Sequence, residues 1–137
     1  MRIFLDANIL FSAAKSDGAV RVLLHRLLEQ GHVLVADAYV IAEARRNLMA
    51  KGPAALADFA ALLPRLTVIP HSASVARNAA EVDWLPAKDR PVLAAAIHAR
   101  CDALVTGDRT HLGSAYGRVI HGVTIHSPRS LAERVLR

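Results

Sequence analysis

Cysteine, aromatic residues and long apolar runs are all scarce in this sequence of 137 residues. Its one cysteine, Cys101, cannot form an internal disulfide or supply a cysteine-based zinc finger, so we expect a reducing compartment. No apolar run reaches the roughly 20 residues that a membrane-spanning helix needs. Asp6 interrupts the first apolar run, residues 3–5, before the core of a signal peptide could form. These absences predict a soluble protein of the cytoplasm with no membrane partner.

Acidic residues are the scarcer charged class. Lys and Arg number 17 against 12 Asp and Glu, which gives a formal net charge of +5. Fourteen of the basic residues are arginine. This preference suits phosphate recognition by the guanidinium group, and a GC-rich genome would explain it equally well. The charge therefore leaves a nucleic-acid partner open, and it makes the positions of the few carboxylates informative.

The remaining composition, 53% hydrophobic and 21% charged, is typical of a folded chain. Five short apolar runs predict buried strands: residues 3–5, 33–36, 66–69, 103–106 and 123–125. Helical patterns alternate with them: residues 20–28, 38–50, 53–63, 72–82, 90–100 and 128–136. This alternation predicts one three-layer α/β/α domain over residues 1–137, with a central parallel sheet of about five strands.

Four acids fall where an open parallel sheet gathers its ligands, beyond the carboxyl ends of the strands. Asp6 ends the first strand and Asp108 follows the fourth, while Asp89 opens the preceding helix and Glu43 lies in the helix over 38–50. Each acid also has a local explanation. Asp89 can cap its helix, Asp108 can belong to a turn, and Glu43 can pair with a neighbouring arginine.

The convergence of these acids is a stronger signal than any one of them. Like charges gather only where a cation offsets their repulsion. A set made of carboxylates alone favours a hard divalent ion, Mg²⁺ or Mn²⁺, over zinc. The sequence therefore predicts a divalent metal site at this edge of the sheet.

Four segments resemble the ordered motifs of PIN-domain nucleases. They are residues 3–10 (IFLDANIL), 38–43 (AYVIAE), 88–96 (KDRPVLAAA) and 102–108 (DALVTGD). The resemblance implies four catalytic metal ligands and two supporting residues that form hydrogen bonds. The ligands would be Asp6, Glu43, Asp89 and Asp108, and the supporting residues Asn8 and Thr106.

Among small PIN proteins, the chain resembles the VapC-type toxins of bacterial toxin–antitoxin pairs. This resemblance implies a Mg²⁺- or Mn²⁺-dependent endoribonuclease that hydrolyses RNA phosphodiester bonds and is neutralised by a cognate antitoxin. Because RNA is a polyanion, it needs positive charge around an acidic site. The basic residues beside the acids, which we expect to bind RNA, are Arg45, Arg46, Lys51, Lys88, Arg90 and Arg109. We expect the antitoxin to cover them, and the apolar helices between residues 20 and 63 to form a homodimer.

Two other classes stay open. A haloacid-dehalogenase-like phosphatase also places an Asp after its first strand, but it needs a second Asp two residues later, where this chain has Asn8. A non-catalytic module, either receiver-like or an RNA-binding scaffold, is the other alternative. The paired acids and the strand-end lysine of a receiver are missing, and metal binding would separate a scaffold from a nuclease. Asp102, at the start of the fourth strand, is expected to be structural, and His98 a surface or packing residue.

Overall fold

The computed structural model describes residues 1–71, 82–85, 89–107 and 115–136 of the chain. Strands and helices alternate along it. The strands are β1 (Arg2–Leu5), β2 (Val33–Asp37), β3 (Thr67–Ile69), β4 (Ala103–Val105), β5 (Val119–Ile120) and β6 (Val123–His126). The helices are α1 (Ala7–Lys15), α2 (Ala19–Glu29), α3 (Ala38–Lys51), α4 (Leu56–Leu62), α6 (Arg90–His98) and α7 (Pro128–Val135), with short 3₁₀ turns at Pro53–Ala55 and Leu63–Arg65.

The strands of the described ranges form one six-stranded sheet in the order β3-β2-β1-β4-β6-β5. Every neighbouring pair is parallel except β5 and β6. This arrangement confirms the predicted α/β fold, with one strand more than the expected five. The sequence did not predict β5, which is two residues long. It is joined to β6 by a tight turn in which His121 and Gly122 both have positive φ, 47° and 85°.

The centre of the sheet forms the core. Ile3, Phe4 and Leu5 of β1 are fully buried, because β1 lies between β2 and β4 and helices cover the sheet. The edge strand β3 differs from the buried strand that the sequence predicted. Thr67 is exposed there, and half of the Val68 side chain is accessible.

Helix α1 was not predicted from the sequence. It begins directly after β1, and the carboxylate of Asp6 caps it by accepting a hydrogen bond from the backbone N–H of Ala7 at 2.7 Å. Ile9 and Leu10 are buried, and Phe11, next in the chain, is also partly buried. Three apolar residues in a row hide the helical period, so the pattern alone does not distinguish this helix from a loop.

The other described helices match their predicted ranges within a few residues. Gly52 is the C-cap of α3, and Ser127 is the N-cap of α7 and forms a capping box, as its position before Pro128 suggested. The predicted helix over 53–63 is α4 with a 3₁₀ turn at each end, each of which contains a proline. Most of the helix predicted over 72–82 lies outside the described residues.

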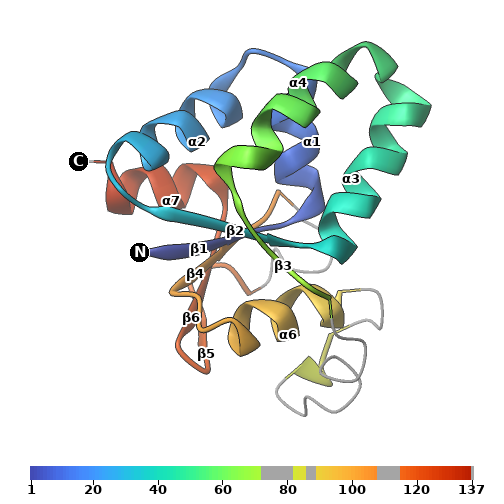
Figure 1. The fold of residues 1–137 in the computed structure, drawn as a ribbon. Coiled ribbons are helices and arrows are strands. Elements are labelled where there is room, and N and C mark those ends of the chain that lie inside the picture. The colour runs from blue at the N-terminus through green and yellow to red at the C-terminus, as the bar shows by residue number, and fades with distance from the viewer. Residues whose placement is uncertain (72–81, 86–88, 108–114, 137) are drawn as a thin grey trace.

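The helices form a layer on each side of the sheet (Figure 1). Helices α1 to α4 lie together on one side, where α1 packs against α2, α3 and α4, and α6 lies on the other. Helix α7 contacts α2 and β6. Within the described ranges, no helix has the length and apolar character to cross a membrane.

Candidate active site

Asp6 stands at the junction of β1 and α1 and is 8% exposed. Its Oδ1 atom accepts the capping hydrogen bond from Ala7, and its Oδ2 atom accepts one from the hydroxyl of Thr106 at 2.7 Å. Thr106 is fully buried and follows β4, the parallel neighbour of β1. The carboxyl ends of two adjacent strands are thus joined through this carboxylate.

Asn8 supports the same junction from the first turn of α1. Its amide Nδ2 donates to the hydroxyl of Thr106 at 3.4 Å, and its Oδ1 accepts from the backbone N–H of Gly107 at 2.8 Å. Asn8 therefore fixes the chain as it leaves β4. The next residue is Asp108, the fourth predicted ligand, which lies outside the described residues.

Three of the predicted ligands share one neighbour, the phenol of Tyr39. Burial raises the pKa of Tyr39, and the negative charges of Glu43, Asp89 and Asp6 raise it further, while the positive charge of Arg46 acts against them. Glu43 lies one turn after Tyr39 on α3, and α3 contacts α6, which Asp89 precedes. The negative charges of carboxylates from three separate segments of the chain therefore all act on this hydroxyl group.

The local explanations for two of these acids find no support in the described residues. Asp89 occupies the N-cap position of α6, but its side chain makes no capping hydrogen bond to that helix, and its Oδ2 atom is buried. Glu43 is half-buried and makes no ion pair with any described residue, including Arg45 and Arg46. Helix capping therefore does not explain Asp89, and pairing with a neighbouring arginine does not explain Glu43.

The donor set fits a hard divalent cation, since Asp6, Glu43 and Asp89 offer only carboxylate oxygens. The described residues contain no group of three or more His, Cys, Asp or Glu side chains placed to hold a metal ion by themselves. Mg²⁺ is usually bound by one or two carboxylates together with water and substrate phosphate. The acids present therefore suit such an ion without enclosing it.

The predicted RNA-binding residues differ in what they contact. The positive charge of Arg46 acts to lower the pKa of Tyr39, whereas Arg45 lies over the ring of Phe59, 5.5 Å from its centre. Lys51 is exposed at the end of α3. Arg90 donates to two backbone oxygens, those of Leu85 at 2.8 Å and Asp83 at 3.1 Å, and so ties residues 82–85 to α6. Lys88 and Arg109 lie outside the described residues.

The structure also shows where two residues lie that were not predicted to belong to the site. Asp102 lies at the opposite edge of the sheet, where its carboxylate accepts from the backbone N–H of Arg2 at 2.8 Å. His98 is exposed at the end of α6. Tyr39 was not among the site residues predicted from the sequence, although its position four residues before Glu43 puts both side chains on one face of a helix.

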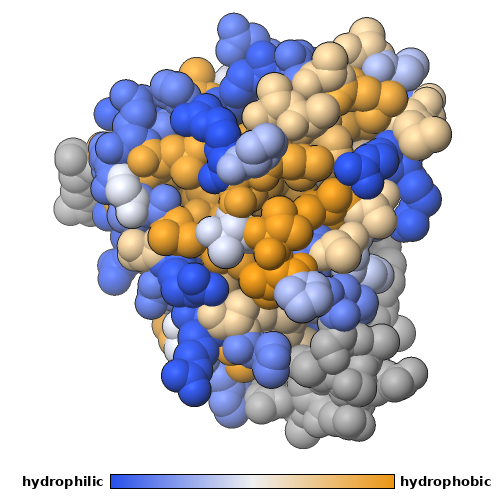
Figure 2. Space-filling model, in the orientation of Figure 1, coloured by the Kyte–Doolittle hydropathy of each residue, from blue (hydrophilic) through white to orange (hydrophobic). Residues whose placement is uncertain are grey.

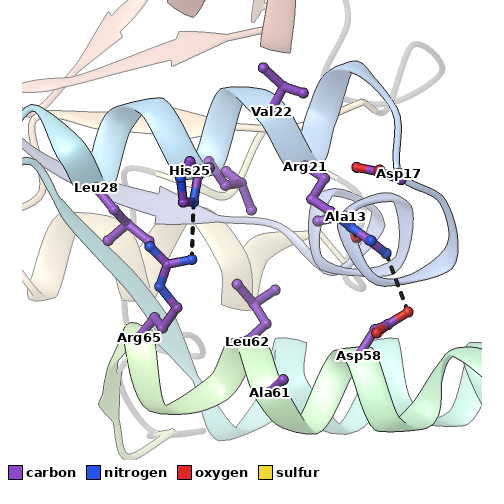
Figure 3. Close-up of a pocket in the computed structure, with 11 residues that line it drawn as sticks. Ala13, Asp17, Arg21, Val22, His25, Leu28, Asp58, Ala61, Leu62 and Arg65 are labelled. Atoms are coloured by element: carbon purple, nitrogen blue, oxygen red, sulfur yellow. Dashed lines mark hydrogen bonds and ion pairs between the residues drawn. The ribbon is translucent and has the colours of Figure 1, made fainter.

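A second feature is a pocket between α2 and α4 with a volume of about 410 Å³. Apolar side chains gather across this face (Figure 2), and those of Val22, Leu28 and Leu62 line the pocket (Figure 3). Polar contacts join its walls at both ends. One is between Arg65 and His25 at 3.3 Å, and the other is an ion pair of Arg21 with Asp58 at 3.5 Å.

Replacing Thr106 with valine tests the buried hydrogen bond from the Thr106 hydroxyl to the Asp6 carboxylate. The two side chains have nearly the same shape, but valine leaves the buried carboxylate without this donor. We expect the free energy of unfolding, measured in urea, to fall by about 1–3 kcal/mol. Thr106→Ser, which keeps the hydroxyl, is the matched control and should retain most of the stability. Equal stability of the valine variant and the wild type would contradict this role.

Comparison with known proteins identifies the class to which this fold and its acidic edge belong. The PIN domain family model matches residues 2–110. The chain therefore belongs to the PIN domain family, as its motifs implied. No curated protein sequence matches it significantly.

Several solved structures share its fold. VapBC2 from Rickettsia felis, bound to a DNA fragment from its promoter, is 19% identical with a TM-score of 0.69 and covers 93% of this chain and 98% of its own. VapC20 from Mycobacterium tuberculosis, a Sarcin-Ricin loop cleaving toxin, is 15% identical with a TM-score of 0.59 and covers 86% and 98%. FitAB bound to the IR36 DNA fragment is 19% identical with a TM-score of 0.63 and covers 92% and 94%. At these identities the likeness establishes the shared fold.

Proposed function

We propose that this protein is a Mg²⁺- or Mn²⁺-dependent endoribonuclease that acts in the cytoplasm as the toxin of a type II toxin–antitoxin pair. The observation that carries the proposal is the position of the Asp6 carboxylate at the carboxyl ends of the adjacent strands β1 and β4, where the Thr106 hydroxyl donates to it, with Glu43 on α3 and Asp89 at the start of α6, two helices that contact each other. Membership of the PIN domain family and the similarity to VapC20, an RNA-cleaving toxin, support it.

In this proposal Asp6, Glu43, Asp89 and Asp108 hold the metal ion. The bound ion would activate water and neutralise charge on the phosphodiester under attack. Thr106 and Asn8 hold the Asp6 carboxylate in place, which matters because partners of metal ligands fix their orientation.

The positive residues of α3 have a separate part in the proposal. Arg46 and Lys51 bind RNA phosphates on the approach to the acids, and Arg45, Lys88 and Arg109 extend this basic rim. Arg90 was predicted to bind RNA as well. Its two hydrogen bonds to backbone oxygens suggest that it mainly holds the segment before α6.

Cleavage of a mixed RNA pool tests the proposal directly. The purified chain should cut RNA internally with Mg²⁺ or Mn²⁺ and should stop when EDTA is added. RNA that is bound but left intact under all three conditions would instead favour the non-catalytic scaffold. The phosphatase alternative is set aside, because the chain belongs to the PIN domain family.

We propose further that an apolar segment of the antitoxin occupies the pocket between α2 and α4. Two of the similar structures, VapBC2 and FitAB, are toxin–antitoxin complexes. Arg65 at one end of the pocket contacts His25 and no carboxylate of the described residues, so an acidic side chain of a partner can pair with it.

The pocket also lies near the acidic site. Ala13, which lines the pocket, is five residues along α1 from Asn8, and this spacing corresponds to roughly 8 Å along the helix. A segment in the pocket can therefore continue toward the acids and cover the basic rim.

Charge placed in the pocket should weaken this complex. Val22 is 52% exposed and Ala61 is also exposed, so Val22→Glu and Ala61→Glu should leave the fold intact. We expect the affinity for the cognate antitoxin, measured by calorimetry, to fall at least about tenfold, because an apolar contact would meet a buried charge. Val119→Glu, at an exposed position of strand β5, is the matched control.

Two results would count against an antitoxin in the pocket. In one, both pocket variants bind the antitoxin as tightly as the wild type. In the other, the variants lose only self-association, which would assign the pocket to a second copy of the chain. The homodimer predicted from the sequence stays a prediction, and light scattering of the isolated chain measures it.

A further inference from the structure

Asp37 is a buried carboxylate that the proposed mechanism does not use. It ends β2, is 1% exposed, and caps α3 by accepting a hydrogen bond from the backbone N–H of Val40 at 3.0 Å. A cap needs only one of its two oxygens. The second oxygen lies 3.1 Å from Nδ1 of His71, which follows β3, the parallel neighbour of β2. Because a carboxylate can only accept, His71 donates from Nδ1 in this bond.

The ring of His71 stacks in turn on Tyr39. The two ring centres are 5.0 Å apart with an angle of 29° between the planes. Tyr39 is therefore held on two sides: its backbone lies in the first turn of α3, which Asp37 caps, and its ring rests on the histidine that Asp37 binds. Buried polar groups joined in this way fix one arrangement of side chains.

The held phenol lies at the acidic edge of the sheet. Tyr39 and Glu43 are one turn apart on α3, Arg46 is one turn further along, and α3 contacts the helix that Asp89 precedes. A tyrosine of ordinary pKa near 10 keeps its proton at neutral pH. Its O–H is then an uncharged donor at the edge of the sheet where the proposed ligands lie, and a phosphate oxygen that binds beside these acids can accept from it.

We propose that the hydroxyl of Tyr39 donates a hydrogen bond to a phosphate oxygen of the substrate and that Asp37 and His71 are positioning residues that hold its ring for this contact. This inference rests on the proposed nuclease function and adds a substrate-binding residue to it. Tyr39 would act alongside the metal ligands, and Asp37 would act only through Tyr39.

Removal of the Tyr39 hydroxyl oxygen tests the proposed hydrogen bond to phosphate. Tyr39→Phe removes the hydroxyl and keeps the ring stacked on His71, and its melting curve measures any change in stability separately from activity. We expect kcat to fall by about tenfold or more, because the lost donor faces charge that develops during the reaction. Affinity for RNA in EDTA, measured on the uncleaved strand by fluorescence anisotropy, should fall severalfold through loss of the same bond.

The positioning role is tested at Asp37. Asp37→Ser keeps a good N-cap for α3 but is too short to hold His71, so kcat should fall as it does in Tyr39→Phe. The double variant should be no worse than Tyr39→Phe alone, because the two changes remove one function. Asp37→Asn can still accept from Val40 and contact His71, and it should restore most of the activity. A merely structural role would instead give additive losses that follow the melting temperatures.

The outcomes also distinguish this inference from the nuclease proposal. If the wild type cleaves RNA with Mn²⁺ and Tyr39→Phe cleaves and binds it equally well, the role of Tyr39 is wrong and the nuclease proposal stands. If the wild type binds RNA without cleaving it, the nuclease proposal fails. The anisotropy measurement in EDTA then still decides whether the Tyr39 hydroxyl contacts the RNA.

Discussion

Replacing Asp6 with asparagine is expected to lower RNA cleavage by roughly 10³-fold, because a lost metal ligand removes several kcal/mol of charge stabilisation and each 1.36 kcal/mol is a factor of ten. The fold should survive. Asparagine is as good an N-cap as aspartate, so it can still accept from Ala7, and its amide can donate to the Thr106 hydroxyl. Initial rates on a labelled RNA, together with a melting curve, measure both effects.

Asp83→Asn is the matched control for this change. Asp83 is also acidic and lies near the start of α6, but it is exposed, and its structural contact uses only its backbone oxygen, which accepts from Arg90. Its replacement should leave the rate nearly unchanged. A fully active Asp6→Asn variant would overturn the assignment of the metal site.

Addition of Mn²⁺ is expected to raise the melting temperature of the wild type by roughly 10 °C. An ion that binds only the folded state stabilises it by about 2.7 kcal/mol at 100 times its dissociation constant, and a domain of this size shifts by roughly 4 °C per kcal/mol. In EDTA the carboxylates repel one another, so the metal-free protein should be the less stable form.

Glu43→Gln distinguishes the repulsion between the carboxylates from their binding of the metal ion. It removes one charge and one ligand, and Glu43 makes no ion pair with the described residues that the change would break. In EDTA this variant should melt at or above the wild-type temperature, yet gain much less from Mn²⁺. We expect the same of Asp108→Asn. Asp83→Asn should respond to Mn²⁺ as the wild type does. Absence of any shift at millimolar Mn²⁺ in the wild type would remove the physical basis of the metal site.

The sequence predicted the elements whose burial leaves a simple pattern. The strands ending at Leu5 and Val105 are apolar on both faces because they lie in the middle of a parallel sheet, and such runs are visible without a structure. Elements without such a pattern were missed. Helix α1 is apolar over three consecutive residues, and β5 has only two residues, with Val119 exposed.

Candidate ligands could also be named from the sequence, since Asp6 and Asp89 stand at the ends of recognisable elements. Their partners could not. Thr106 is 100 residues from Asp6, and the bond between them exists because β4 pairs with β1. In the same way, Arg90 and Arg46 were predicted from the sequence as equivalent RNA-binding residues. Only the structure separates Arg90, which binds backbone oxygens, from Arg46, whose charge acts on Tyr39.

By itself, the sequence therefore determined the fold class, the family motifs and the set of acids, because these depend on local patterns of apolar residues and on positions along the chain. The tertiary structure decided which groups surround those acids. Asp37 and His71 are 34 residues apart and meet only because β2 and β3 are adjacent parallel strands that end at the same edge. Strand order is set by the packing of the whole sheet, so no local pattern could have placed His71 against Tyr39.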